Sequence, residues 1–294
     1  MIRPRWARTV PGAALPLLAV FAALMILWYG AAIGLNRAQV RERLGEDSGW
    51  RAIVAGSWSM QRPVLPAPHQ IAIELKQGIF DFPVTSPRSL VYHAWVTLSA
   101  ALAGLAIALA LGMLLAIGIV HLRLLDRSMM PWVIASQTVP VLAIAPMVVV
   151  VLGNLGITGL IPKAAIAGYL AFFPITVGMV KGLRAPDPLQ LDLMRTYDAP
   201  GRDVFGKLRW PASLGFLFPS LRVAVALSLV GAIVAELPTG AQAGLGARLL
   251  IGSYYGQTVQ IWSALILASV LSLLGIAAVA FIENLAARRR GGRL

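Results

Sequence analysis

The chain has 294 residues, of which 58% are hydrophobic and only 13% are charged, and its mean hydropathy is +0.77. Soluble globular proteins carry about 25% charged and about 45–50% apolar residues, so this composition argues against a soluble protein and is typical of an integral membrane protein. The net charge of +13 does not indicate nucleic-acid binding, because the basic residues lie in short clusters between apolar runs, as they do in the cytoplasmic loops of membrane proteins.

The N-terminal segment is basic at first and then apolar from Val10 to Leu35. The apolar core of a signal peptide has about 7–15 residues. This run is longer and no clear cleavage site follows it, so the pattern predicts an uncleaved first transmembrane helix.

Five further segments have the length and composition of a membrane span, since about 20 apolar residues in a helix cross the hydrocarbon core of a bilayer. They are Ala94–Val120, Met129–Leu152, Leu160–Val180, Leu214–Leu237 and Ile261–Ile282. None of them alternates apolar and polar residues as the strands of a membrane barrel do. The sequence therefore predicts an all-α integral membrane protein with about six transmembrane helices.

The distribution of Lys and Arg predicts the orientation of these spans. With the N-terminus in the cytoplasm, most basic residues fall in cytoplasmic segments, and both termini are cytoplasmic. The external loop from Asn36 to Leu90 departs from this trend, because it has seven basic and five acidic residues. Within this loop we expect an extended connector at Leu65–Pro68 and a short interfacial helix over His69–Lys76.

The longest cytoplasmic segment, residues 181–213, contains the starts of two short helices. Asp187-Pro188 places a capping carboxylate before a proline at the first helical position. Asp198-Ala199-Pro200 repeats this pattern with the proline in the first turn. Pro211 is predicted to end the second helix.

The stretch GRDVFGKL at 201–208 is close to the phosphate-binding motif G-x-x-x-x-G-K-[ST]. A phosphate-binding loop follows a buried strand and opens a helix, whereas a polar helix is predicted before Gly201. Leu208 stands where a magnesium-binding Ser or Thr is needed, and Asp203 would place a carboxylate among the phosphate oxygens. We interpret the match as coincidental, and no nucleotide or other cofactor is predicted for this chain.

The same stretch has one apolar helical face, because Val204, Phe205 and Leu208 are spaced as neighbours on a helix surface. Basic residues project from the other faces. Such a face can dock into a groove of a partner protein or pack on the membrane domain of its own chain. The periodicity alone leaves both interpretations open.

The loop resembles that of the permease subunits of binding-protein-dependent ABC importers, which has the form E-A-A-x-x-x-G-x(9)-I-x-L-P. Asp192-Leu193-Met194 stands at the E-A-A position, Asp198 at the family glycine, and Leu208-Arg209-Trp210-Pro211 at I-x-L-P. The spacing matches throughout, while Asp192 and Asp198 depart in identity from the family pattern.

Further segments resemble the nitrate, sulfonate, taurine and thiamine-precursor branch of these permeases, and the resemblance extends from about Pro63 to Glu283. The segments are Thr97-Leu98 with Gly104 and Gly112, Val139–Pro146, Phe172–Ile175 with Lys181–Leu183, and Gly231–Glu236 with Gly244–Gly246.

This resemblance implies a type I ABC importer permease fold in which two permease copies pair in the bacterial inner membrane. Coupling helices of the cytoplasmic loop would dock onto separate ATPase subunits, and a periplasmic binding protein would deliver the substrate, so the chain itself is not expected to be an enzyme. The residues implied in coupling are Asp192, Asp198, Ala199, Gly201, Val204, Phe205, Lys207, Leu208 and Pro211.

The implied domain organisation has four parts. Residues 1–35 form a cytoplasmic tail and the first span, and residues 36–90 form a periplasmic loop with interfacial helices. Residues 91–285 form the core permease domain, which includes the coupling loop 181–213, and residues 286–294 form a basic cytoplasmic tail.

Polar and charged residues within membrane spans are functional candidates, because they are costly to place in lipid. Glu236, at the end of the fifth span, is a candidate for the translocation pathway; the alternatives are an interfacial carboxylate or a pair with Arg248. Gln137, Pro140 and Met147 in the third span are further pathway candidates, since prolines free backbone carbonyls that can line a cavity, and a plain helix kink is the alternative.

Lys163 is predicted to extend to water at the outer membrane edge. Arg222 is a candidate partner for an acidic loop residue such as Asp192, and direct contact with an anion is the alternative. The three histidines lack metal-ligand spacing, and the chain has no cysteine. No Ser-His-Asp set and no carboxylate pair faces a common site. No metal site and no catalytic centre are therefore predicted.

An ion-gradient-driven secondary transporter is the main alternative function. Such transporters use intramembrane carboxylates or inverted repeats, whereas only Glu236 is available here and no repeat is evident. The predicted function is therefore the permease subunit of an ATP-driven importer, with a sulfonate, taurine, nitrate or a thiamine-type pyrimidine as the solute.

Overall fold

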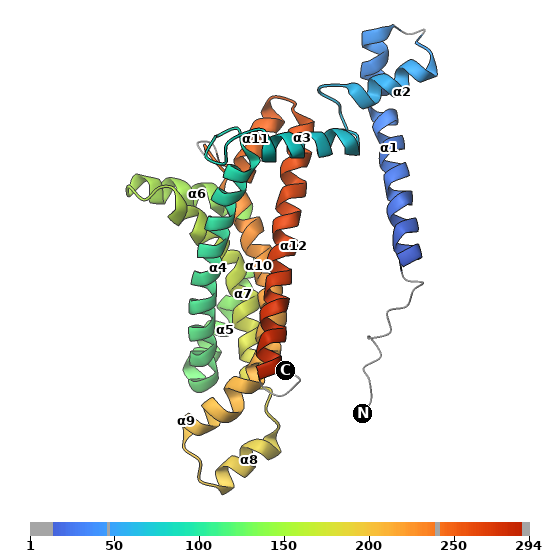
Figure 1. The fold of residues 1–294 in the computed structure, drawn as a ribbon. Helices are drawn as coiled ribbons and strands as arrows, with labels where there is room; N and C mark the ends of the chain where they lie inside the picture. The colour runs from blue at the N-terminus through green and yellow to red at the C-terminus, as the bar shows by residue number, and fades with distance from the viewer. Residues whose placement is uncertain (1–13, 46–47, 239–241, 290–294) are drawn as a thin grey trace. The chain divides into compact units, whose positions relative to one another are not determined.

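The computed structural model describes residues 14–45, 48–238 and 242–289, and the regular secondary structure of these residues is helical (Figure 1). The described residues form two compact units, one within the ranges 1–82 and 251–263 and the other within 83–250 and 264–294. The last helix, α12 (Thr258–Arg289), begins in the first unit and continues in the second. The predicted all-α fold class is confirmed.

The first unit is built on a long apolar helix and two shorter helices. They are α1 (Ala14–Leu44), α2 (Trp50–Ser59) and α3 (Pro68–Phe80). The first predicted span extends past Leu35 to Leu44, and its residues 10–13 lie outside the described part of the chain. The helix predicted over His69–Lys76 is present as α3 and is longer at both ends.

Asn36 organises this unit, because its fully buried side chain satisfies the backbone of the connector before α3. Its amide nitrogen donates a hydrogen bond to the Leu65 carbonyl at 2.9 Å. Its amide oxygen accepts one from the Val64 backbone N–H at 2.7 Å. Buried backbone groups need such partners, so one asparagine fixes the path of a loop that has no regular structure.

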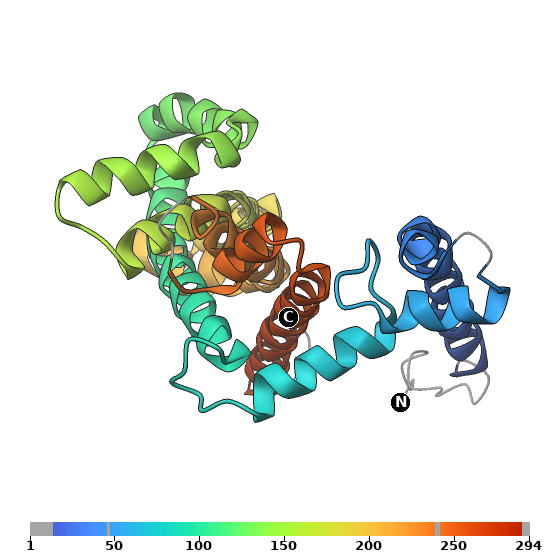
Figure 2. The same cartoon turned by 90° about the horizontal axis from the view of Figure 1, so that it is seen from above.

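The second unit contains a bundle of helices that lie side by side (Figures 1 and 2). They are α4 (Leu90–His121), α7 (Leu160–Leu183) and α10 (Trp210–Ala235), together with the second-unit part of α12. A Cβ added at Gly104 would lie 2.6 Å from the Ala167 Cβ, and one added at Gly231 would lie 2.7 Å from the Ala167 Cα. Small residues therefore bring the three backbones together, as is usual for helices packed in lipid.

The predicted third span is not one straight helix, which corrects the expectation for Met129–Leu152. It is divided into α5 (Arg123–Ala135), a short 3-10 turn η2 (Ser136–Thr138) and α6 (Val141–Asn154), with a bend of 101°. Pro140 lacks an N–H and keeps Val139 in an extended conformation, so the helix ends there. Figure 2 shows α5 and α6 to one side of the bundle.

Within the described residues, five helices are long and apolar enough to cross a membrane, and the bent pair counts as a sixth if it is one span. The prediction of about six spans is confirmed in this form.

The loop between α7 and α10 contains α8 (Pro188–Thr196), α9 (Gly201–Asp203) and the π-helical turn η3 (Val204–Arg209). Helix is continuous from Gly201 to Ala235, so Pro211 does not end a separate short helix, contrary to the expectation. In the wide turn before it, the Trp210 N–H donates to the Phe205 carbonyl five residues back. Such a turn accommodates a proline ring that would disrupt a regular α-helical turn.

The two predicted helix starts in this loop have different outcomes. Asp187 caps α8, because its side chain accepts a hydrogen bond from the Leu189 N–H at 2.8 Å and the Gln190 side chain caps in return. Asp198 does not cap the second helix, whose N-cap is Pro200. Asp198 instead adopts φ +47°, the left-handed conformation that glycine favours.

Candidate functional sites

A buried polar network lies at the end of α10 that is far from the coupling loop. It consists of His93 and Thr97 of α4, Lys163 of α7, and Glu236, which directly follows α10. Glu236 is fully buried; it accepts hydrogen bonds from the Thr97 hydroxyl at 2.8 Å and from the Gly246 N–H at 3.0 Å. Lys163 supplies the counter-charge, with its Nζ 3.1 Å from Glu236 Oε1.

The same network holds the segment that leads into α11 (Leu245–Tyr254). The Gly244 N–H donates to His93 Nδ1 at 3.0 Å, and the Leu245 N–H donates to the Thr97 hydroxyl at 2.8 Å. His93 Nε2 lies 2.9 Å from the Pro87 carbonyl, which places the imidazole proton on Nε2 and leaves Nδ1 as the acceptor. Side chains of the bundle thus satisfy backbone groups of a segment that has no hydrogen-bonded regular structure.

Gly240, Gly244 and Gly246 follow the fifth span and predict a broken, reentrant segment there. Two of these three glycines are required by the packing around the network. Gly244 has φ +125°, and a Cβ there would lie 2.1 Å from the Glu236 Cδ. A Cβ at Gly246 would lie 2.3 Å from the Ile233 carbonyl oxygen. Gly240 lies outside the described residues.

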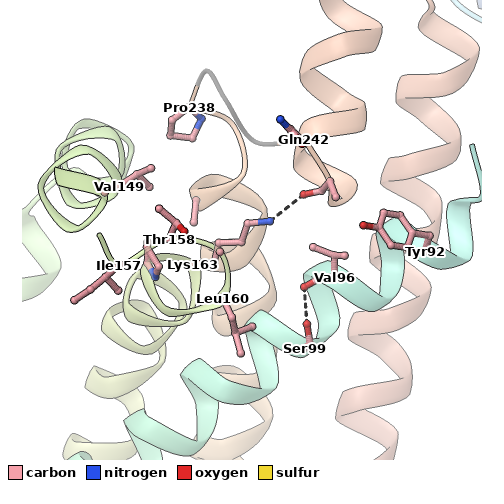
Figure 3. Close-up of a pocket in the computed structure, with 15 residues that line it drawn as sticks. Tyr92, Val96, Ser99, Val149, Ile157, Thr158, Leu160, Lys163, Pro238 and Gln242 are labelled. Carbon is pink, nitrogen blue, oxygen red and sulfur yellow. Dashed lines mark hydrogen bonds between the residues drawn. The ribbon is translucent and has the colours of Figure 1, made fainter. Parts of the chain in front are cut away.

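A cavity of about 770 Å³ lies beside the network, between α4, α6, the start of α7 and the segment after α10 (Figure 3). Its walls include the apolar residues Val96, Val149, Ile157, Leu160, Pro162, Ala235 and Pro238. Its polar groups come from Tyr92, Ser99, Thr158, Lys163 and Gln242. Lys163 reaches across one side and donates to the Ala243 carbonyl at 2.9 Å.

The sequence-predicted pathway residues are not brought together. Gln137 and Pro140 are exposed at the break between η2 and α6, and Met147 is exposed on α6; none of the three lines the cavity. Glu236 lies behind the cavity wall, where Lys163 and the backbone surround it. Lys163 does not extend to water as expected, because its ammonium group points at Glu236.

The partners of Glu236 could have been anticipated in part. A carboxylate in an apolar segment needs a nearby counter-charge, and Lys163 is a basic residue at the apolar start of another span. His93 and Thr97 carry no such signal, because their role depends on the backbone of a distant segment.

The coupling loop exposes apolar side chains on α8. Leu189, Leu193 and Tyr197 follow one face of this helix and are 77%, 56% and 77% exposed; we call them the α8 stripe. Asp192, at the first position of the family motif, forms an exposed ion pair with Arg195 at 2.9 Å. Arg222 pairs with Glu283 of α12, so the expected pairing of Arg222 with Asp192 is wrong.

The apolar face of GRDVFGKL packs inward. The Phe205 ring centroid lies 5.5 Å from that of His121 and 6.1 Å from that of Trp210, and Phe205 packs against the core cluster of the second unit. Val204, Leu208 and Pro211 are likewise half-buried, as is Ala199. The structure thus shows this face packed on its own domain, and docking of Val204, Phe205 and Leu208 on a partner stays a prediction.

The polar residues of this stretch show helix geometry and no phosphate-binding loop. Lys207 and Gly201 are exposed, and Lys207 pairs with Asp203 one turn earlier at 2.8 Å. Arg209 turns back and donates to the Leu183 carbonyl at 2.8 Å. This contact joins the end of α7 to the start of α10 at the base of the loop.

The family profile described as binding-protein-dependent transport system inner membrane component matches residues 108–291, more than half of the chain. The chain belongs to this family. The permease is 33% identical to the formylaminopyrimidine transport permease protein of Halalkalibacterium halodurans, over 76% of this chain and 84% of that protein. It is 30% identical to the riboflavin transport system permease protein of Chloroflexus aurantiacus, over 76% and 80%. It is 22% identical to the putative aliphatic sulfonates transport permease protein of Bacillus subtilis, over 79% and 80%.

Family membership confirms the resemblance found in the loop and spans, and with it the predicted role as the permease subunit of an ABC importer. The protein is a multi-pass membrane permease of an ABC importer, and permeases of this family work with ATPase and binding-protein partners. The ion-gradient-driven alternative is thereby superseded.

Proposed function

We propose that this permease acts as one of two paired copies in the bacterial inner membrane, with both termini in the cytoplasm. Its spans form the pathway for a small solute that an external binding protein delivers, and separate ATPase subunits hydrolyse ATP. The relatives named above are permeases for formylaminopyrimidine, riboflavin and, in the putative case, aliphatic sulfonates, which supports a small organic molecule as the solute.

In this proposal the two ends of the second unit have different roles. The coupling loop, residues 181–213, lies at the cytoplasmic end, and α11 begins at the opposite end (Figure 1). The cavity and the polar network belong to that opposite, external end, next to the segment that precedes α11. The core permease domain is then residues 91–285, preceded by the tail and first span (1–35) and the periplasmic loop (36–90), and followed by the basic tail 286–294.

The α8 stripe is the observation that carries the coupling role. Leu189 and Leu193 of α8 and Tyr197, the residue directly after this helix, expose large side chains on one face, and such a face needs a surface to cover it. Helices that present such a face dock into apolar grooves of partner proteins. A groove on the ATPase subunit fits this surface, whereas Phe205 is engaged within the permease.

Asp192 and Asp198 support the docking surface without forming it. The Asp192–Arg195 pair lies on a flank of α8, and the left-handed backbone at Asp198 turns the chain sharply after the helix. Asp198 thus holds a backbone conformation that glycine favours, and aspartate tolerates this conformation better than most residues do.

The test compares Leu193→Asp with Thr196→Asp in affinity pull-downs of the tagged permease in mild detergent. Both variants add one carboxylate to an exposed position of α8, but only Leu193 belongs to the stripe. Burying a leucine contributes about 1.5–3 kcal/mol, so Leu193→Asp should weaken ATPase binding by at least about tenfold. Thr196→Asp should retain it.

A wild-type permease that captures no ATPase subunit would contradict the proposed assembly. If both variants capture the ATPase subunit equally well, the α8 stripe is not part of the docking surface.

A further inference from the structure

The cavity beside the polar network has no net charge. Lys163 is the one residue charged at neutral pH among the residues described as lining it. Its ammonium group is already neutralised by Glu236 at 3.1 Å, and the Glu236 carboxylate is itself fully buried. A solute anion in this cavity would lose its hydration without gaining a free counter-charge.

The cavity nevertheless offers unused hydrogen-bonding groups. Within the described residues, the side chains of Tyr92, Thr158 and Gln242 face the cavity and make no hydrogen bond to the protein. Lys163 uses two of its three N–H groups, on Glu236 and on the Ala243 carbonyl. Hydroxyls and a primary amide both donate and accept, which suits the amide and amino edges of a neutral molecule.

The remaining walls are apolar and come from different helices. Val96 of α4, Val149 of α6 and Leu160 of α7 present aliphatic surface to the same space (Figure 3). A ring with two apolar faces and polar edges can use these walls, whereas a sugar would bring more hydroxyls than the site can satisfy. The volume of about 770 Å³ lies within the usual range for small-molecule sites, about 300–1,000 Å³.

We propose that this cavity is a solute site of the permease and that it takes a neutral, planar nitrogen heterocycle bearing amide or amino groups. The proposal rests on the proposed function, because it assigns the chemical class of the solute that the importer carries. It selects heterocycles over the anionic solutes, sulfonates and nitrate, that the sequence left open.

Gly153 allows the cavity to be filled without disturbing the bundle. It lies near the end of α6 and lines the cavity, and a Cβ built on it meets no atom within 4 Å. Gly153→Phe should therefore place a ring in the solute space. Val151→Phe is the matched control, because Val151 is exposed on the same helix and does not line the cavity.

The experiment measures binding of matched neutral and anionic probes to the purified permease–ATPase complex by equilibrium dialysis. The pairs are nicotinamide with nicotinate and uracil with orotate; in each pair the ring is the same and the second member carries a carboxylate. We expect at least one neutral probe to bind about tenfold or more tightly than its anionic partner. Gly153→Phe should weaken that binding by at least about tenfold, and Val151→Phe should leave it unchanged.

A milder variant, Tyr92→Phe, removes one hydroxyl and keeps the ring. It tests the cavity even if the Gly153→Phe protein does not fold. It should weaken binding about fivefold, the usual effect of losing one hydrogen bond. Binding that is unchanged in Tyr92→Phe and in a folded Gly153→Phe would overturn the proposal. Anions that bind as tightly as the neutral probes, or neutral probes that fail to bind at millimolar concentration, would also overturn it.

The same preparations separate this proposal from the proposed function. ATPase subunits that co-purify with the permease, together with failed heterocycle binding, refute the cavity assignment and leave the importer role intact. Absence of the ATPase refutes the importer role itself.

Discussion

Replacing Lys163 with methionine would leave the Glu236 carboxylate buried without its counter-ion. Glu236 would keep its hydrogen bonds from Thr97 and Gly246 but lose the ammonium group 3.1 Å away. Removing one partner of a buried ion pair costs about 3–5 kcal/mol, and loss of the Lys163 hydrogen bond to Ala243 adds about 0.5–1.5 kcal/mol. We expect Lys163→Met to be among the most destabilising single changes in the second unit.

The double variant Lys163→Met, Glu236→Gln tests whether charge causes this loss. Glutamine keeps an oxygen that accepts from Thr97 and Gly246, and it carries no charge that needs neutralising. We therefore expect the double variant to recover at least about 2 kcal/mol relative to Lys163→Met alone. The assay is equilibrium unfolding of the purified permease in detergent. If the double variant costs the sum of the two single changes, to within about 0.5 kcal/mol, the pair is not coupled and the reasoning fails.

Three further predictions concern the backbone at special positions. Gly244→Ala should lower the unfolding temperature markedly, because it combines a left-handed φ with a Cβ placed on the Glu236 carboxyl group. Gly34→Ala is the control and should not lower the unfolding temperature, since a Cβ at Gly34 meets nothing within 4 Å. Asp198→Gly should retain ATPase co-purification and stabilise the permease by up to about 1–2 kcal/mol. Asp198→Val should destabilise the permease, because φ +47° is costly for a branched side chain. Equal unfolding temperatures of the two variants would show that this backbone conformation is not held in solution. Asn36→Ala should speed hydrogen exchange at the Val64 and Leu65 amides, because both donate to the Asn36 side chain. Exchange within α7 should not change. Unchanged exchange at the Val64 and Leu65 amides would argue against the role given to Asn36.

The spans could be predicted from sequence because their length and composition are nearly sufficient for a membrane helix. The break in the third span was only partly foreseeable. Pro140 predicts a kink in the helix, but the local sequence does not distinguish a modest kink from the observed bend of 101°. The angle of the bend depends on the neighbouring helices, because the segments on both sides of the break pack on them.

The polar network was missed because its members are far apart in the chain. Glu236 was identified as unusual, yet Thr97 lies 139 residues before it, and neither helical periodicity nor composition connects the two. The face of Phe205 was ambiguous for a related reason. An apolar helical face indicates burial, and only the fold shows that His121 and Trp210 already cover it.

The loss of the helix stop at Pro211 has a mechanical consequence. Because α9, η3 and α10 form one helix from Gly201 to Ala235, a movement of this helix at the coupling loop is transmitted to its opposite end, next to Glu236. A helix of 35 residues is about 50 Å long at about 1.5 Å per residue, so a tilt of about 5° displaces one end by about 4 Å. A displacement of that size exceeds the length of every hydrogen bond around Glu236. A small tilt of the helix at the loop would therefore be enough to break the hydrogen bonds that attach the start of α11 to the bundle.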